Sequence, residues 1–241
     1  MNSLNQFEQV NNGGFAQKGA ASAAAAEIMN KVFLWMTIGL ALTGTVAIWV
    51  ADNTPLIQSL IGFPMLALFL VQIGLVFWLS ARVMNMQAST ATIVFLAYSL
   101  LSGVTLAPIF LVYTAASIGT TFLVTAGTFG VMATYGMVTK TDLTRIGNIL
   151  MMALIGLIIA SVVNMFLGSS MMDLIISAVG VLIFTGLTAY DAQKIKDMSV
   201  QFQGNDADVQ TKVAVIGALS LYLDFINLFL MLLRLLGDRR D

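Results

Sequence analysis

The segment SLYLDFINLFLMLLRLL, residues 220–236, is almost entirely apolar, yet Asp224 lies near its middle. A run of about 20 mainly apolar residues is long enough for a helix to cross the hydrocarbon core of a membrane. An ionised carboxylate inside that core costs a few kcal/mol even on lenient scales. The segment therefore predicts a transmembrane helix, and it raises the question of what Asp224 does inside it.

The composition extends this prediction to the whole chain. Of the 241 residues, 59% are hydrophobic and only 10% are charged, and the mean hydropathy is +0.91. A soluble domain carries about 25% charged residues. The sequence predicts an all-α integral membrane protein whose seven transmembrane helices cover residues 32–51, 57–80, 90–112, 118–138, 146–167, 174–196 and 213–236. Residues 1–31 are expected to form a flexible cytoplasmic tail, residues 32–236 the membrane domain, and residues 237–241 a short carboxyl-terminal tail.

The chain lacks two residue types, which limits the catalytic and pH-responsive groups that it can use. The sequence contains neither cysteine nor histidine, which excludes disulfides, thiolate catalysis and the side chain that most often responds to pH near neutrality. The net charge of −1 argues against a nucleic-acid partner, because phosphate binding needs a basic surface. We expect no cofactor, and we expect any pH response to come from carboxylates.

Lysine and arginine predict the orientation, because they concentrate on the cytoplasmic side. The amino-terminal segment and alternate loops hold Lys18, Lys31, Arg82, Lys140, Arg145, Lys194, Lys196 and Lys212. The amino terminus is therefore expected in the cytoplasm and the carboxyl terminus outside. Arg234, Arg239 and Arg240 disagree with this assignment, and the alternative is that one segment is re-entrant and only six cross.

The polar residues of the last two spans form a candidate site. Ser220, Asp224 and Asn227 are spaced so that they share one face of a helix. Asp191 lies towards the cytoplasmic end of the preceding span, with Thr188 three residues before it on the same face. The expected span boundaries place the two aspartates about 10 Å apart in depth. Adjacent helices could bring them together.

Two carboxylates that share a buried site cannot both ionise cheaply. We therefore expect Asp191 and Asp224 to share a proton in a closed state and to repel each other once it leaves. Arg82, at the cytoplasmic end of the second span, is a possible latch on Asp191, although a basic residue there also serves as a simple membrane anchor. A purely structural hydrogen bond at each aspartate is the alternative.

Small residues recur every four positions in two other spans. Ala126, Gly130 and Thr134 form one such series, and Gly156, Ala160 and Asn164 form another. Series of this kind predict close helix packing, and Asn164 is expected to hydrogen-bond across an interface.

Several segments resemble the Bax inhibitor-1 (transmembrane Bax inhibitor motif) family, and its bacterial inner-membrane members in particular. The resemblance covers about residues 28 to 237 and is strongest in GLTAYDAQKIKDM (186–198), LSLYLDFINLFLMLLRLLG (219–237), AYSLLSGVTLAPIFLVYTAASI (97–118) and TAGTFGVMATYGMVTKTDL (125–143). It implies a bundle whose last helix is central and wrapped by the other six. It also implies a pH-sensitive calcium leak in the bacterial inner membrane, with Asp191 and Asp224 as the sensor pair and as transient calcium ligands.

Two other functions remain open from the sequence. One is an interaction protein that modulates a membrane protease or another integral membrane protein, with the amino-terminal tail as the contact. The other is an intramembrane aspartyl protease, because AYDAQ (189–193) resembles the Tyr-Asp half of such a site. The expected Gly-x-Gly-Asp half is absent, since the next span offers LYLDF (221–225) instead. We therefore predict that the protein is not an enzyme.

Overall fold

The computed structural model describes the backbone of residues 2–240 and the side chains of residue 23 and of residues 25–240. The elements are α1 (Asn2–Asp52), α2 (Thr54–Leu60), α3 (Phe63–Arg82), the 3-10 turn η1 (Val83–Asn85), α4 (Ala88–Leu106), α5 (Ile109–Val112), α6 (Ala115–Val138), α7 (Thr144–Leu167), α8 (Ser170–Phe202) and α9 (Ala207–Leu236). Seven of them are long and apolar enough to cross a membrane, namely α1 from Ala25 onward, α3, α4, α6, α7, α8 and α9. The predicted all-α membrane fold with seven spans is confirmed.

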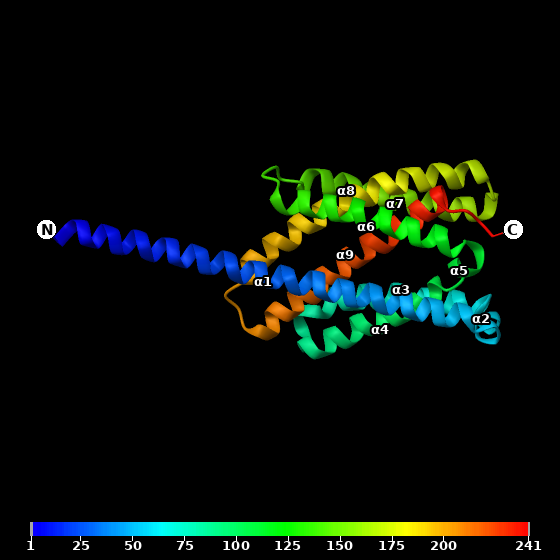
Figure 1. Cartoon of the computed structure of the whole chain (residues 1–241), viewed down its shortest axis with the longest axis horizontal. Helices are drawn as coiled ribbons and strands as arrows, with labels where there is room; N and C mark the ends of the chain where they lie inside the picture. Colours follow the sequence, from blue (N-terminus) through cyan, green and yellow to red (C-terminus); the bar gives the residue numbers. More distant parts are fainter. Residues whose placement is uncertain (1, 241) are drawn as a thin grey trace.

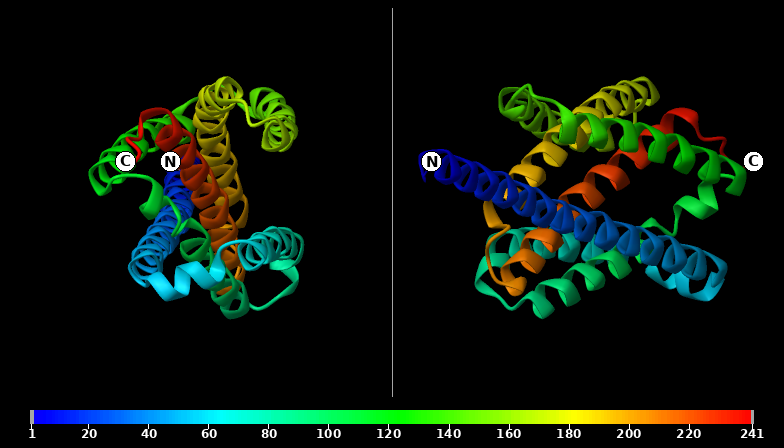
Figure 2. Two further views of the ribbon diagram at one scale, coloured as in Figure 1. Left: turned by 90° about the vertical axis from the view of Figure 1, so that its right-hand side faces the viewer. Right: turned by 60° about the vertical axis from the view of Figure 1, so that its left-hand side comes forward.

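The last helix, α9, is the centre of the bundle. In its most apolar window 67% of the residues are buried, against 11% for α3 and for α7. It packs against α8, α1, α6 and α4, and its contact with α8 is the most extensive between any two helices of the described chain. Figure 1 and Figure 2 show α9, in orange and red, crossing between these neighbours. The predicted central position of the last helix is confirmed.

Two spans lie at the periphery. α3 packs mainly on α4, and α7 packs on α8, so neither contributes much to the surface of α9. Their outward faces carry large exposed apolar side chains, such as Phe77 on α3 and Phe166 on α7. Such faces are stable against hydrocarbon and costly against water.

Several helix ends differ from the ends of the apolar runs. The run 57–80 begins in α2, before α3, and the run 90–112 continues past the end of α4 into α5, whereas α1, α8 and α9 extend further than their runs. α8 continues to Phe202 and α9 begins at Ala207, so the long polar segment between the expected spans is mostly helical. A helix that has left the hydrocarbon core tolerates polar side chains, so hydropathy marks the membrane segment and not the end of the helix. At the other end of the chain, α1 begins at Asn2 and already buries Ile28 in the core, before residue 32. The mobility expected for residues 1–31 stays a prediction.

One acidic side chain ties the start of α9 to the start of α4. Asp208 accepts a hydrogen bond from the Ala88 backbone N–H through Oδ1, at 3.0 Å, and forms an ion pair with Lys212 through Oδ2, at 2.7 Å. The first N–H groups of a helix have no partner within the helix. Asp208 therefore caps α4 from a distant part of the sequence.

A buried polar contact joins α9 to α1 and α4 near the middle of the bundle. The Tyr222 hydroxyl lies 2.7 Å from Thr43 Oγ1, which donates a hydrogen bond to the Ser99 carbonyl oxygen at 2.9 Å. The rings of Phe95 and Tyr98 meet the Tyr222 ring edge to face. This cluster fixes the side of α9 that faces α1 and α4, and it leaves another side of the helix to face α8.

Candidate functional site in the core of the bundle

Asp224 lies in the buried middle of α9. Its side chain is 6% exposed, between Tyr222 and Phe225 on a helix that is enclosed by four others. Its Oδ2 atom is fully buried and has no hydrogen-bond partner among the described residues. Because a buried polar atom without a partner is costly, Asp224 is retained against a clear energetic disadvantage.

Close contacts on either side of Asp224 define how α8 and α9 are aligned. A Cβ atom added to Gly180 of α8 would lie 2.7 Å from the sulfur of Met231, and one added to Gly217 of α9 would lie 3.0 Å from Ile195 Cγ2. In an antiparallel pair, this alignment places Asp224 opposite Thr188. Asp191 is then offset from Asp224 by about one helical turn, or about 5 Å along the axis.

This alignment revises the separation expected from the apolar runs, which was about 10 Å. The difference arises because α8 continues past the end of its apolar run and the two helices meet at glycines that allow close approach. The side chain of Asp191 is half-buried and lies near enough to Asp224 for their charges to interact. The structure thus brings the two predicted carboxylates together.

Two lysines of α8 lie beyond this pair, towards the connection between α8 and α9. Lys194 is one turn from Asp191 and interacts with its charge, and the Lys194 ammonium also lies 5.9 Å from the centre of the Tyr190 ring. Lys196 donates a hydrogen bond of 2.6 Å to the Met137 carbonyl oxygen, at the carboxyl end of α6. Lys194 therefore compensates Asp191 in part, whereas Asp224 has no neighbouring cation among the charges that act on it.

Two of the three predicted supporting residues donate side-chain hydrogen bonds to backbone carbonyl oxygens of their own helices. The Thr188 hydroxyl is buried and donates to the Phe184 carbonyl oxygen at 2.8 Å, and the Asn227 amide donates to the Leu223 carbonyl oxygen at 2.8 Å. Ser220 is half-buried and has no side-chain hydrogen bond within the described part of the chain. Their oxygen atoms remain able to accept, so a supporting role for these three residues stays a prediction.

Arg82 is not brought to the carboxylate pair. It is exposed at the end of α3, a helix that packs mainly on α4. Among the side chains that the structure describes, the only ion pairs are Lys31–Glu27 and Lys212–Asp208. The geometry therefore gives no support to the predicted Arg82–Asp191 latch and is compatible with a membrane anchor.

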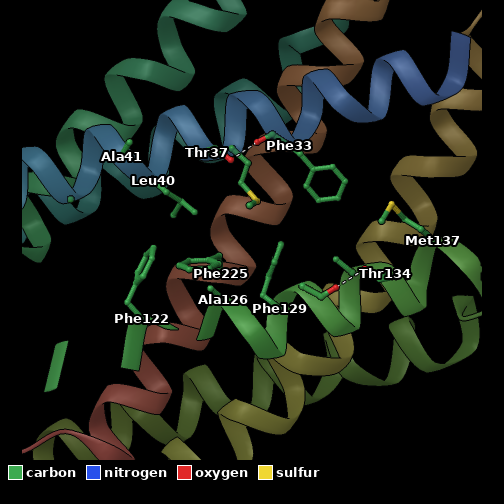
Figure 3. Close-up of a pocket in the computed structure, with 14 residues that line it drawn as sticks. Phe33, Thr37, Leu40, Ala41, Phe122, Ala126, Phe129, Thr134, Met137 and Phe225 are labelled. Atoms are coloured by element: carbon green, nitrogen blue, oxygen red, sulfur yellow. Dashed lines mark hydrogen bonds between the residues drawn. The ribbon is translucent and has the colours of Figure 1, made fainter. Parts of the chain in front are cut away.

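A groove opens beside the site, between α1 and α6. It has a volume of about 590 Å³ and its lining is almost wholly apolar. Figure 3 shows Phe225, the residue after Asp224, at its floor, with Phe33 and Leu40 on one side and Phe122 and Phe129 on the other. The groove therefore borders α9 at the residue that follows Asp224.

The groove also corrects an expectation about the first small-residue series. Ala126, Gly130 and Thr134 line the groove, and a Cβ atom on Gly130 would have no neighbour within 4 Å. They leave space instead of packing against another helix. Asn164 does bond across an interface as expected, since its amide donates to Asp173 Oδ1 of α8 at 2.6 Å.

Two polar groups of the core were not singled out from the sequence. One is the Tyr222–Thr43 contact described above, and the other is Gln72 of α3, whose amide group bonds the hydroxyls of Ser102 and Thr105 on α4. Gln72 is the single amide within residues 63–82, which is a detectable signal. Tyr222 and Thr43 are 179 residues apart and carry no such local signal.

The ligand set for a metal ion is small. Within the described residues, no group of three or more acidic side chains comes together. Asp191 and Asp224 alone supply fewer oxygens than the six to eight that calcium prefers. Any calcium ion at this pair would need backbone carbonyl oxygens and water as further ligands.

Comparisons with known proteins agree with this architecture. The family model described as inhibitor of apoptosis-promoting Bax1 matches residues 25–241. The chain is 49% identical over 215 residues to the inner membrane protein YbhL of Escherichia coli (strain K12), covering 88% of this chain and 92% of that protein. It is 48% identical over 217 residues to an uncharacterized protein of Borreliella burgdorferi, covering 89% and 93%, and 44% identical over 216 residues to one of Rickettsia prowazekii, covering 88% and 90%. None of these names states an enzymatic activity.

Proposed function

This chain belongs to the Bax inhibitor-1 family of membrane proteins, and from that premise we propose that it is a pH-sensitive cation leak, with calcium as the permeant ion and with Asp191 and Asp224 as its gate. The observation that carries the proposal is the Asp224 carboxylate, which is 6% exposed and has one oxygen without a partner in the described chain. A side chain that costs stability in the centre of a membrane bundle is typical of a functional group. The family membership is consistent with a channel-like role.

The closed state follows from the proximity of the two carboxylates. Two like charges in a poorly solvated site repel strongly, and one shared proton removes that repulsion. With the proton in place, α8 and α9 keep the close contacts at Gly180 and Gly217, and no water-filled path reaches Asp224. Acidic conditions therefore hold the gate shut.

Loss of the shared proton opens the gate. Repulsion between the two carboxylates separates α8 from α9, and water enters to solvate them. The exposed pair then attracts cations, which pass along the two carboxylates with backbone oxygens and water completing their coordination. Because two carboxylates bind calcium weakly, the ion crosses without being stored. In this scheme the inner (cytoplasmic) membrane of a bacterium is the site of action, as in the Escherichia coli relative.

The test is calcium flux into vesicles that contain the purified full-length protein. We expect the flux to rise between about pH 6 and about pH 8 and Asp224→Asn to reduce the pH-dependent part by about tenfold or more, because a neutral amide cannot lose a proton. Asp191→Asn should act in the same direction. The matched control is Asp197→Asn, an exposed position on α8 two turns from the site, which should behave as the wild type. A flux no greater than that of empty vesicles across this range would contradict the proposal.

A further inference from the structure

A second cavity lies at the end of the bundle opposite the connection between α8 and α9. It has a volume of about 630 Å³ and lies between the turn that joins α7 to α8, the end of α9 and the carboxyl-terminal segment. In Figure 1 these segments meet at the right-hand side of the bundle, near the chain end marked C. Its polar lining includes Asn164, Asp173, Ser177, Arg234 and Arg239. None of these residues belongs to the carboxylate pair in the core.

One wall of this cavity is fixed by Asn164. The Asn164 side chain is 4% exposed, donates to the Ser169 carbonyl oxygen at 3.1 Å and accepts from the Ser169 N–H at 3.1 Å. It also donates to Asp173 Oδ1, at 2.6 Å. Between these residues Gly168 has φ +64°, a left-handed conformation that ends α7 and suits glycine. The α7–α8 turn is therefore held in one shape by a buried amide.

The opposite wall carries the two arginines. Arg234 lies in the last turn of α9, and Arg239 lies in the segment that follows. That segment is held by backbone hydrogen bonds, from the Arg240 N–H to the Val112 carbonyl oxygen at 2.9 Å and from the Thr114 N–H to the Asp238 carbonyl oxygen at 3.1 Å. Arg239 is thereby fixed at the cavity although it lies two residues from the end of the chain.

The charges in the cavity favour an anion. Two arginines and one acidic residue, Asp173, line the cavity, and the Asp173 carboxylate already accepts a hydrogen bond from Asn164. Among the described side chains of residues 25–240, no acidic group lies within ion-pair distance of Arg234 or Arg239. Arginine matches the oxygens of a phosphate group with two parallel hydrogen bonds. The cavity thus offers donors for one phosphate group.

The surroundings favour a phosphate that is carried by a lipid. The cavity lies at the ends of the membrane-spanning helices, the level at which lipid headgroups are found. Met165 and Leu174 also line it and are 74% and 57% exposed, so its rim is apolar on the side that faces the bilayer. A ligand with a phosphate headgroup and acyl chains satisfies both the arginines and this rim.

We propose that this cavity binds the phosphate group of an anionic membrane lipid through Arg234 and Arg239. The proposal explains why arginines occur at the end of the last span, where the distribution of positive charge along the chain does not predict them. It goes beyond the proposed cation leak and does not depend on it, since the site shares no residue with the carboxylate pair.

The test compares lipid retention by variants of the full-length protein. The wild type is equilibrated in mixed micelles of phosphatidylglycerol and phosphatidylcholine, and bound lipid is counted by native mass spectrometry. We expect the double variant Arg234→Gln/Arg239→Gln to retain phosphatidylglycerol about tenfold less well, because charge-assisted hydrogen bonds to phosphate are lost. Asp173→Asn should have the opposite effect and retain more, because it removes the only negative charge in the cavity.

The control is the double variant Lys140→Gln/Arg145→Gln, which removes two positive charges in and beside the α6–α7 loop. This variant should retain phosphatidylglycerol as the wild type does. Equal retention by the wild type and the double arginine variant would overturn the proposal, as would an equal loss in the control. Displacement of the lipid by inorganic phosphate alone would overturn the assignment of a lipid and identify free phosphate as the ligand. Increased retention by Asp173→Asn provides support that does not depend on how well the arginine variant folds.

Discussion

At the scale of single residues, two neighbouring polar side chains of α9 differ in how they are satisfied. The hydroxyl of Tyr222 is paired with Thr43 in a fully buried cluster, as buried polar groups in proteins normally are. Asp224, two residues further along, keeps one oxygen without a partner in the described structure. The Tyr222 contact therefore contributes to stability, and a role of Asp224 in gating stays a proposal.

Removing the Tyr222 hydroxyl should weaken the fold without affecting the gate. We expect Tyr222→Phe to lower the free energy of unfolding by about 0.5–1.5 kcal/mol, the usual net value of one hydrogen bond. The measurement is unfolding of the purified protein in mixed micelles of increasing denaturing detergent, followed by circular dichroism. Tyr135→Phe, at an exposed tyrosine of α6, is the control and should cause no change. If the free energy of unfolding falls equally in both variants, the Tyr222–Thr43 contact does not contribute to stability.

At the scale of the helices, some glycines allow two spans to approach closely, whereas other glycines lie where no neighbouring helix is near. On α6, a Cβ atom at Gly136 would overlap the Ala189 carbonyl oxygen of α8, whereas one at Gly130 would meet nothing within 4 Å. Both residues lie on the same helix and belong to the same apolar run, so the sequence gives no means of separating them. The close approach of α6 to α8 at Ala189 therefore requires a glycine at position 136.

These two glycines provide a matched pair of variants. Gly136→Ala should destabilise the protein by about 1–3 kcal/mol, because the backbone of α8 must move to admit the methyl group. Gly130→Ala should leave stability unchanged or raise it slightly, because alanine is the better helix former. The same detergent titration measures both. A Gly136→Ala protein as stable as the wild type would show that α6 and α8 are not in close contact at Ala189.

At the scale of the whole molecule, apolar runs were enough to predict the number of spans, and the distribution of lysine and arginine predicts their direction. Each of the seven expected spans overlaps one long helix, although the span 57–80 begins in α2, before α3, and the span 90–112 runs past the end of α4 into α5. The number of spans is predictable because the length of a spanning helix is determined by the bilayer. The ends of the helices were harder to predict, since α8 and α9 continue into polar sequence. Asp191 and Asp224 were found because a charge in an apolar run is conspicuous. The spacing between these two aspartates is known only from the contacts at Gly180 and Gly217, because those contacts depend on packing between helices.

The predicted direction can be tested because the chain has no cysteine. Single cysteines at Asn205, between α8 and α9, and at Ile61, between α2 and α3, occupy exposed positions that should lie on opposite sides of the membrane. With a membrane-impermeant maleimide, we expect Ile61→Cys to be labelled in bacteria whose outer membrane has been removed and Asn205→Cys to be labelled only after lysis. Asp238→Cys should label like Ile61→Cys. Labelling of Asp238→Cys only after lysis would mean that six segments cross and that the carboxyl terminus is cytoplasmic.

The central position of α9 has a consequence for the order in which the protein is made. The ribosome synthesises this helix last, so the preceding six spans enter the bilayer while the element that fills the space between them does not yet exist. Until then Thr43 lacks its partner hydroxyl, and the buried faces of α1, α4, α6 and α8 have only each other or lipid to pack against. At about 5–20 residues per second, synthesis of the 30 residues of α9 takes about 1.5–6 s. A chain released before residue 207 would therefore be an open bundle, which quality-control proteases could distinguish from the finished protein.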